Sequence, residues 1–241
     1  VQSSIGKKVA KNLGLPQPVS LDRFESGQRL VRGSVLVGRA EGDDMSVSNS
    51  VARILSDLHA EVYVNSRDDA KDALIEAGIE AKANTGSKDK FKVLLFDASN
   101  ISNADQLKQV YEFFHQVARS VEKSGRVVII GRPPEDIDDV QTALAQRSLE
   151  GFVKSVGKEF KRGITAQLIY VAKGSEKNLD SALRFFTSAR SAYVSGQVVR
   201  VGAGNTIDID WSQPLAGKTM LVTGASRGIG EAIARVLARE G

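Results

Sequence analysis

The sequence predicts a doubly wound α/β fold built on a parallel β-sheet. Short apolar runs alternate with segments of helical periodicity between residues 33 and 204. The runs have almost no polar alternation, which indicates strands that are buried on both faces of a sheet. Helical segments separate the runs, as connections between parallel strands require. With 241 residues, 41% of them hydrophobic, the chain is long and apolar enough to bury such a core.

The expected strands and helices alternate along this part of the chain. The strands cover 34–38, 61–64, 91–97, 126–131, 165–171 and 196–201. The helices cover 48–58, 68–77, 104–122, 138–160 and 177–186. In the helix at 104–122, apolar residues recur on one face, as in an amphipathic helix. These residues are Leu107, Val110, Phe113, Phe114, Val117 and Val121.

The chain is expected to divide into four parts. Residues 1–32 carry few periodic signals and are expected to form an N-terminal arm that lies on the surface. Residues 33–204 form the doubly wound domain. Residues 205–217 contain glycine, proline and an Asp pair, and are expected to be a linker. Residues 218–241 begin a second domain with a strand, a glycine-rich turn and a helix.

Composition excludes several classes of function. The net charge is +4, and the 33 basic and 29 acidic residues are interleaved, so no basic block favours nucleic acid. The chain has no cysteine, which excludes disulfides, thiolate zinc sites and a cysteine nucleophile. No apolar run approaches the length of a membrane span, and the first residues lack the apolar core of a signal peptide. A cytoplasmic protein without membrane contact is expected.

No metal site is expected either. His59 and His115 are the only histidines, and neither has a carboxylate or a second histidine at ligand spacing on its helix. Glu76, Glu80 and the acidic cluster at 135–139 are typical of solvated charge and helix capping.

The pattern at 221–240 carries the clearest functional signal. An apolar strand end, 221–223, leads into a glycine-rich turn, 224–230, and then into a helix, 231–240. A phosphate-binding turn needs glycine because its backbone turns with positive φ and its N–H groups must approach a pyrophosphate closely. The helix N-terminus adds partial positive charge. The expected cofactor-binding residues are Gly224, Ala225, Ser226, Arg227, Gly228, Ile229 and Gly230.

A glycine pattern alone also fits a tight turn that binds nothing, but the longer string is more specific. Thr-Gly-x-x-x-Gly-Ile-Gly, between a strand and a helix, resembles the cofactor turn of the short-chain dehydrogenase/reductase superfamily. The sequence TGASRGIGEAIA, at 223–234, resembles the 3-oxoacyl-[acyl-carrier-protein] reductase branch of that family. The resemblance implies a Rossmann fold with NADH or NADPH as cofactor, and it places Ser226 and Arg227 beside the adenosine ribose and phosphates. The residue that selects between the two cofactors is expected past Gly241.

The first domain resembles the same family. LEGFVKSVGKEFKRGITAQLIYVAKG, at 149–174, resembles the segment after the catalytic Tyr-x-x-x-Lys helix. RFFTSARSAYVSGQVVRVGAG, at 184–204, resembles the C-terminal segment of these reductases. VARIL at 51–55 and IARVL at 233–237 also occupy the same place after their strand–turn units. Residues 33–204 therefore resemble a diverged reductase domain that precedes a second copy.

The catalytic positions of this first copy are all changed. Counting back from Gly151 and Phe152 places Thr142 at the tyrosine position and Gln146 at the lysine position, and Arg132 stands at the serine position. Reduction of a ketone requires a tyrosine hydroxyl that donates a proton, with its pKa lowered by a lysine. A threonine hydroxyl and an uncharged amide cannot replace them. No catalytic residue is therefore expected in this chain.

The cofactor turn of the first copy is changed as well. GRAEGDDMSVSNS, at 38–50, keeps Gly38 and Gly42 but has acidic residues where the third glycine is expected. Glu41, Asp43 and Asp44 are expected to crowd the pyrophosphate position and repel an anionic ligand. Aspartates at a helix start are also ordinary capping residues. The FDASN turn, at 96–100, replaces the Asn-Asn-Ala-Gly turn of the family. The first copy is expected to be retained for structure.

Together, these resemblances imply the N-terminal part of a high-molecular-weight 3-oxoacyl-[acyl-carrier-protein] reductase. Such a protein has a flavodoxin-like, inactive Rossmann domain followed by an active ketoreductase domain. It reduces a 3-oxoacyl thioester of acyl carrier protein or coenzyme A in fatty-acid metabolism, with a serine, a tyrosine and a lysine that are expected downstream of Gly241. A homodimer formed by the helices at 104–122 and 138–160 is expected, with Phe113 and Phe152 as residues to truncate.

Two alternatives remain open at this point. The chain could be a binding or assembly module that docks a carrier protein or a partner subunit. That reading requires an exposed apolar patch near 97–100 or on the helix near 175–190. The first domain could instead bind a nucleotide or flavin in its own cleft, which requires an open, uncharged turn at 38–44.

Overall fold

The computed structural model describes residue 6 and residues 12–13, 19–25, 27–65, 70–86, 89–205 and 209–241. The chain separates into two compact units, Val1–Gly204 and Asn205–Gly241. The predicted helix start at 68–69 and the predicted arm residues before 19, apart from 6 and 12–13, lie outside the described residues.

The first unit is built on a single parallel β-sheet, which confirms the predicted fold class. Its strands run in the order β3-β2-β1-β4-β5-β6-β7, and every neighbouring pair is parallel. The strands are β1 (Ser34–Arg39), β2 (Glu61–Val64), β3 (Lys82–Ala83), β4 (Phe91–Asp97), β5 (Val121–Gly131), β6 (Thr165–Val171) and β7 (Gln197–Val201). All residues of β6 and nearly all of β1, β4 and β5 are buried, as the uninterrupted apolar runs predict.

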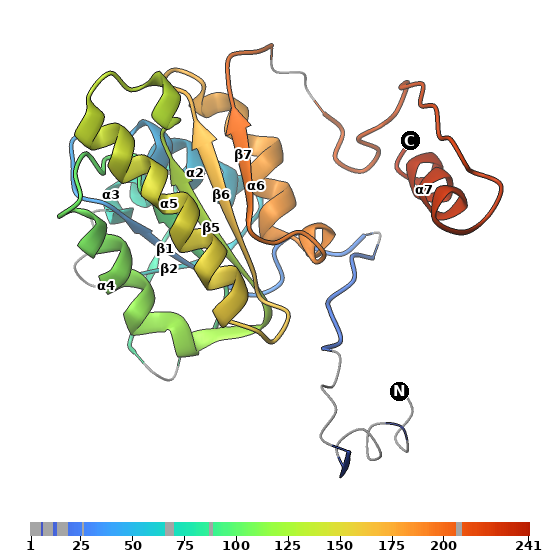
Figure 1. Cartoon of the computed structure of the whole chain (residues 1–241), viewed down its shortest axis with the longest axis horizontal. Coiled ribbons are helices and arrows are strands. Elements are labelled where there is room, and N and C mark those ends of the chain that lie inside the picture. The colour runs from blue at the N-terminus through green and yellow to red at the C-terminus, as the bar shows by residue number, and fades with distance from the viewer. Residues whose placement is uncertain are drawn as a thin grey trace. The chain divides into compact units, whose positions relative to one another are not determined.

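Helices cover both faces of this sheet and create two hydrophobic cores (Figure 1). On one face lie α2 (Ser46–Asp57), α3 (Ala70–Glu76) and α6 (Asp180–Thr187). On the other face lie α4 (Leu107–Val117) and α5 (Val140–Glu159). Strand residues point alternately into the two cores, so Val35 and Val37 pack under α2 while Leu36 packs on the side of α4. The sheet is therefore a rigid base for the loops at its carboxyl edge.

The boundary between α4 and β5 differs from the prediction. The helical pattern predicted a helix to residue 122, but α4 ends at Val117, a short 3₁₀ turn follows (Ala118–Ser120), and β5 begins at Val121. Val121 pairs with Phe91 of β4 and is buried in the same core as Val117. Its spacing from Val117 matches a helix, but its burial comes from the sheet. Tertiary pairing therefore overrides the local periodicity here.

Strand β3 was not predicted, and its connection to β4 carries no helix in its described residues, 84–86 and 89–90. Parallel strands are normally joined by a crossover helix. The side chains of β2 and β3 that lie on the same face of the sheet as α4 and α5 include charged residues. Lys82 donates a hydrogen bond to Glu61 at 2.5 Å and lies over the ring of Tyr63, which packs edge-on against Phe91. An ion pair and an aromatic ring thus cover this edge of the sheet.

The described part of the N-terminal arm contacts the amino edge of the sheet. Asp22 lies 2.5 Å from the Lys92 ammonium of β4 and 3.2 Å from the guanidinium of Arg32. The ring of Phe24 lies 3.9 Å below the guanidinium of Arg190. These contacts hold residues 19–25 against the first unit.

The second unit contains one helix, α7 (Gly228–Arg239), in its described residues. The strand predicted to end at 221–223 does not form, and Leu221 is 92% exposed. A buried parallel strand needs a hydrogen-bonded neighbour, and the described part of this unit offers none. No residue of α7 is buried, and Ile229, Ile233 and Val236 on it are exposed. Its amphipathic face is therefore solvent-exposed.

Candidate functional site

The loops that follow β1, β4 and β5 meet at the carboxyl edge of the sheet. The connection after β1 leads to β2 on one side, and the connection after β4 leads to β5 on the other, so the sheet has its topological switch point between β1 and β4. In open α/β sheets, ligands bind in the crevice at this point. A cofactor cleft of the first unit would therefore lie at this point of the sheet.

Arg132 fills this place in the first unit. It follows β5 directly, and its side chain is only 10% exposed. Its guanidinium donates to Glu176 at 2.6 Å and to the carbonyl of Val171 at 3.1 Å through Nη1. Through Nη2 it donates to Asp44 at 2.8 Å and to the hydroxyl of Ser46 at 2.9 Å. One side chain thus joins the loops after β1, β5 and β6.

The two carboxylates in this arrangement meet the start of helix α2. Asp44 accepts a hydrogen bond from the backbone N–H of Ser46, the first residue of α2, at 2.9 Å. Glu176, 12% exposed, accepts from the Ser46 hydroxyl at 3.2 Å. A helix N-terminus attracts negative charge, because its first N–H groups have no partner within the helix. We call Asp44, Ser46, Arg132 and Glu176 the edge cluster.

Both acids of the edge cluster are held in their charged form. Burial raises the pKa of Asp44, but the hydrogen bonds from Ser46 and Arg132 outweigh it and lower the pKa to about 2. Burial also raises the pKa of Glu176, and hydrogen bonds from its own backbone N–H and from Arg132 lower it below its ordinary value. The cluster therefore carries two negative charges and one positive charge at neutral pH.

The loop after β1 is packed tightly against the loop after β4. Gly42 has a φ of +151°, and a Cβ at this position would lie 2.7 Å from the side chain of Asn100. The amide of Asn100 donates to the carbonyl of Asp44 at 2.8 Å, and Arg39 donates to the carbonyl of Gly42 at 2.7 Å. The open turn that a nucleotide binder requires at 38–44 is therefore closed by the chain itself.

The prediction that Glu41, Asp43 and Asp44 crowd one position is wrong, because the three side chains lie in different surroundings. Asp44 enters the edge cluster, whereas Glu41 and Asp43 are exposed. The backbone N–H of Glu41 is not available to a ligand, because it donates a hydrogen bond to the side-chain oxygen of Gln109 on α4 at 2.8 Å. Repulsion among the acids is small because Arg132 neutralises part of the charge and the other two acids face solvent.

Thr142 and Gln146, which the resemblance matches to the tyrosine and the lysine of the family, have structural roles. Gln146 is fully buried and donates to the carbonyls of Ala98 and Ile101 at 2.9 and 2.8 Å, while its own amide oxygen accepts from the backbone N–H of Arg132. Thr142 donates its hydroxyl hydrogen to one acceptor among Asp139 and the carbonyl of Ser102, at 2.7 and 3.0 Å. Gln146 thus joins the loop after β4 to β5, and Thr142 lies in the capped first turn of α5.

The predicted cofactor turn, residues 224–230, lies in the second unit as a turn followed by α7. Gly224 and Gly228 have φ of +66° and +67°. A Cβ on Gly230 would lie 2.2 Å from the carbonyl oxygen of Gly224, so only glycine fits there. Ala225 is half-buried, and Ser226, Arg227 and Ile229 are exposed, with Ile229 in the first turn of α7. The backbone has the conformation that such a turn needs, on a segment without its strand.

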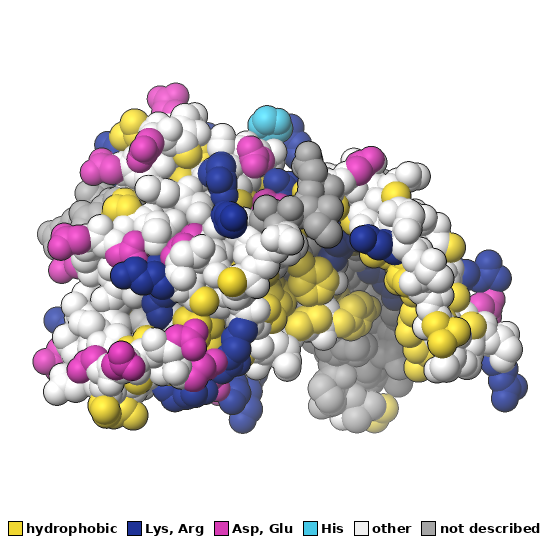
Figure 2. All heavy atoms as spheres, turned by 90° about the horizontal axis from the view of Figure 1, so that it is seen from above, with side chains coloured by type: hydrophobic (Ala, Val, Ile, Leu, Met, Phe, Trp, Pro, Cys, Tyr) yellow, Lys and Arg dark blue, Asp and Glu magenta, His cyan; other side chains and the backbone are white. Residues whose placement is uncertain are grey.

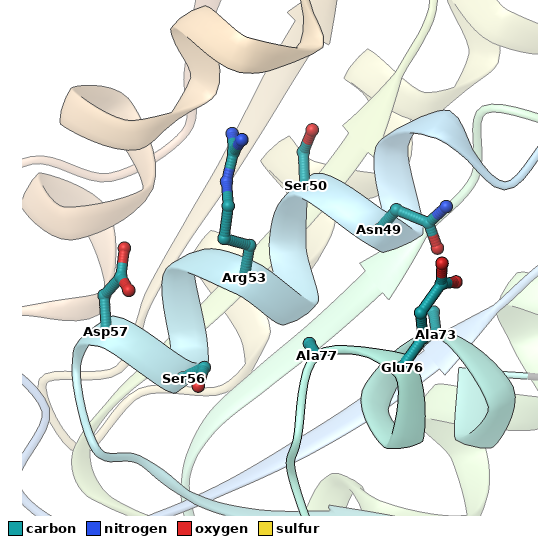
Figure 3. A pocket seen from close by; sticks show the side chains of 8 residues that line it. All are labelled: Asn49, Ser50, Arg53, Ser56, Asp57, Ala73, Glu76 and Ala77. Carbon is teal, nitrogen blue, oxygen red and sulfur yellow. The ribbon is translucent and has the colours of Figure 1, made fainter.

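Other surface features of the described residues offer no built site. A groove of about 500 Å³ lies between α2 and α3, and no residue of the edge cluster lines it (Figure 3). Its lining consists of Asn49, Ser50, Arg53, Ser56, Asp57, Ala73, Glu76 and Ala77. Figure 2 shows Lys and Arg side chains interspersed with Asp and Glu over the face that it presents. His59 and His115 are both exposed, and His115 stacks on Tyr111.

In the part of the chain that the structure describes, no group of three or more His, Asp or Glu side chains is placed to hold a metal ion. None of the helices found there has the length and apolar character needed to cross a bilayer.

Comparison with solved structures identifies the fold. A structure of BdcA in complex with NADPH has a TM-score of 0.56 to this chain at 15% identity, and the match covers 73% of this chain and 95% of BdcA. The structure of BdcA from E. coli has a TM-score of 0.54 at 20% identity, over 72% of this chain and 100% of BdcA. The first unit has the short-chain dehydrogenase/reductase fold. A Serratia marcescens short-chain dehydrogenase/reductase variant matches with a TM-score of 0.56 at 14% identity, over 73% of this chain and 98% of the variant.

Sequence-level comparisons add nothing to this. No family model and no curated protein sequence matches the chain. At these identities the structural likeness establishes the fold and leaves the function to the geometry of the site.

Sequence reasoning did not single out two members of the edge cluster, Ser46 and Glu176. Glu176 is separated by 44 positions from Arg132, and it begins a 3₁₀ turn (Glu176–Leu179) whose later residues were predicted as the start of a helix. The sequence contained an indirect signal. An arginine directly after a buried strand needs an acidic partner, and the loop after the neighbouring strand is the nearest place for it.

Proposed function

We propose that this chain is the N-terminal part of a cytoplasmic, NAD(P)H-dependent reductase of 3-oxoacyl thioesters, and that its first unit is structural and non-catalytic. The thioester is carried by acyl carrier protein or coenzyme A. The proposal combines the reductase fold of the first unit, its altered site and the cofactor turn at 224–230.

The edge cluster is the observation that carries the structural role of the first unit. Arg132 occupies the switch point and joins three loops, so a dinucleotide would have to displace a buried ion pair to enter. The residues do not fit a bound cofactor here. Gln146 is committed to backbone groups, and no tyrosine or lysine stands in the described residues at the catalytic positions to donate a proton.

The turn at 224–230 supports the cofactor-dependent role of the whole protein. Gly224, Gly228 and Gly230 adopt the conformations that allow backbone N–H groups to approach a pyrophosphate, and α7 places its N-terminus next to them. These residues fit the pyrophosphate of NADH or NADPH. BdcA, which shares the fold of the first unit, was solved in complex with NADPH. When bound, the nicotinamide would supply the hydride for the β-carbonyl, with the proton donors expected downstream.

The test compares reductase activity in two forms of the protein. We expect residues 1–241 to show no NADPH oxidation with a 3-oxoacyl-coenzyme A, and a form extended through the downstream domain to be active. In the extended form, G230A should abolish activity, because its methyl group would clash with the Gly224 carbonyl. R132A in the same form should leave the activity of the second domain unchanged. Turnover by residues 1–241 alone would show the proposal to be wrong.

A homodimer through α4 and α5 is part of the proposal, but its contact residues change. Phe113 is buried in the core against Phe96, and Phe152 packs on Phe114, so truncating them tests folding rather than association. The outer faces of the two helices expose Tyr111, Val140 and Leu144 instead. Substitution of Leu144 with aspartate should convert a dimer to a monomer in sedimentation experiments, with thermal stability retained.

The alternative of a docking module is less well supported. It required an exposed apolar patch at 97–100 or at 175–190. Among the large apolar residues described in these two segments, Phe185 alone is exposed, at 37%. A single exposed side chain is normal for a protein surface.

A further inference from the structure

The two carboxylates of the edge cluster, Asp44 and Glu176, lie at the helix start where a dinucleotide fold holds its pyrophosphate. In dinucleotide-binding α/β folds, the pyrophosphate lies at the N-terminus of the helix that follows β1. Here the corresponding helix is α2, and the anion at its first residue is the carboxylate of Asp44, 2.9 Å from the Ser46 N–H. Glu176 adds a second carboxylate on the Ser46 hydroxyl. Two carboxylate charges therefore stand where a pyrophosphate would bring two negative charges.

We propose that Asp44 and Glu176, held by Arg132, are an internal replacement for the pyrophosphate of a dinucleotide. The inference rests on the proposed function, in which the first unit is a reductase fold that no longer takes a cofactor. It adds the reason why the fold remains closed without one. In a cofactor-bound domain the ligand ties the loops of the carboxyl edge together, and here the chain supplies the anion itself.

The hydrogen bonds of Arg132 support this assignment. Its two terminal nitrogens each contact one carboxylate, at 2.6 Å for Glu176 and 2.8 Å for Asp44, so the guanidinium bridges the two acids. Arginine binds paired anionic oxygens through such a fork. If the acids were made neutral, Arg132, the Ser46 hydroxyl and the first N–H of α2 would all remain. These groups constitute an anion site whose internal negative charge has been removed, with neutral amides that an external anion can displace.

The neighbouring acids provide a matched control. Glu41 and Asp43 lie in the same loop but are exposed and outside the cluster. E41Q/D43N changes the net charge by the same amount as D44N/E176Q, so it separates the loss of overall negative charge from the neutralisation of the two acids that contact Arg132. R132A/D44N/E176Q removes the cation that would hold an external anion.

The experiment measures thermal unfolding of residues 1–241 with inorganic pyrophosphate as the probe, at constant ionic strength. For D44N/E176Q we expect pyrophosphate at ten times its Kd to raise the Tm by about 3 °C, as linkage predicts for a binder of the folded state. Wild type, E41Q/D43N and R132A/D44N/E176Q should show no rise beyond a response that all the variants share. The comparison between variants removes any contribution of residues 224–230, which all of them share.

Two outcomes would overturn the inference. One is a folded D44N/E176Q whose Tm does not respond to pyrophosphate, and the other is an equal response in E41Q/D43N. If D44N/E176Q does not fold, D44N alone serves in its place, with a smaller rise expected because Glu176 remains. Failure of the proposed function is detected separately. It would appear as turnover by wild-type residues 1–241, and the pyrophosphate experiment does not measure turnover.

Discussion

At the scale of single residues, three side chains at the carboxyl edge of the sheet have structural roles. Arg132, Thr142 and Gln146 are the residues that the resemblance matches to the serine, tyrosine and lysine of the reductase family, and this match stays a prediction. Each has a structural partner, since Arg132 bridges two acids, Thr142 bonds Asp139 and Gln146 bonds backbone carbonyls. The site is thus fully used for stability, which agrees with the absence of an accessible proton donor among these three residues.

Removal of Arg132 should be costly for stability. R132M leaves Glu176 buried without its partner, and the loss of one member of a buried ion pair costs on the order of 3 kcal/mol. Urea unfolding followed by circular dichroism measures the change. R147M is the control, because Arg147 is half exposed and its ion pairs lie at the surface, where they contribute little. An R132M midpoint equal to that of R147M would contradict this account of the edge cluster.

The edge cluster should also make stability depend on acid pH. Asp44 has a folded-state pKa of about 2, below its ordinary value of 3.8, so its stabilising effect is present above about pH 4 and is lost as the pH falls towards 2. We expect the difference in Tm between wild type and D44N to be constant from pH 7 to pH 5 and to shrink below pH 4. A difference that persists unchanged at pH 2.5 would argue against a charged Asp44.

Restoring two catalytic residues should not restore catalysis. T142Y/Q146K returns the tyrosine and the lysine, but Arg132 still fills the switch point and the loop at 40–44 stays closed. The lysine also leaves the carbonyls of Ala98 and Ile101 without the Gln146 amide. NADPH oxidation with a 3-oxoacyl-coenzyme A should remain at background in residues 1–241. Measurable turnover would show that the closed cleft admits cofactor.

At the scale of elements, the sequence predicted the strands better than the helix ends. Strands buried on both faces leave an uninterrupted apolar run, so 91–97 and 165–171 match the structure residue for residue. The prediction at 61–64 also matches, although this strand buries only one of its faces fully. Strand β3 was missed because its two residues, Lys82 and Ala83, are exposed and carry no apolar pattern. The strand before the turn at 224 was predicted from the same kind of apolar run, but such a run forms a strand only where a neighbouring strand pairs with it.

The polar edge at β2 and β3 should protect the sheet from association. An exposed sheet edge is a template for pairing with other chains unless charge blunts it. E61V/K82V replaces the Lys82–Glu61 ion pair with apolar side chains, and we expect increased light scattering on heating at unchanged concentration. K108A/E112A removes a similar exposed ion pair from α4 and should not scatter more than wild type. Equal scattering by both variants would contradict a protective role.

At the scale of the whole molecule, the two units differ in how much of themselves they bury. The first unit has two hydrophobic cores on a seven-stranded sheet. In the second unit, α7 has no buried residue. The expected function was predicted from the resemblance to a reductase branch. The geometry of the edge cluster could not be predicted from the sequence, because its acids come from loops far apart in the chain.

This difference predicts the outcome of limited proteolysis. Trypsin should cleave residues 1–241 within 205–235 before it cleaves between 34 and 201, since a site without buried contacts is accessible to a protease. The fragment that retains residues 1–204 should keep its Tm to within about 2 °C of the intact chain. Mass spectrometry identifies the cleavage points. Early cleavage inside the sheet, with residues 205–241 intact, would contradict the prediction.

The strand order also determines when each part of the sheet can form during synthesis on the ribosome. Leu36 of β1 pairs with Leu94 of β4, and the edge strand β7 joins only when Val201 has been synthesised. The sheet must therefore wait for distant partners, and parallel pairings of this kind form slowly. The segment at 224–230 leaves the ribosome after every strand of that sheet. A slow-folding first unit is thus synthesised ahead of the cofactor turn, and domains made in this order tend to fold one after the other.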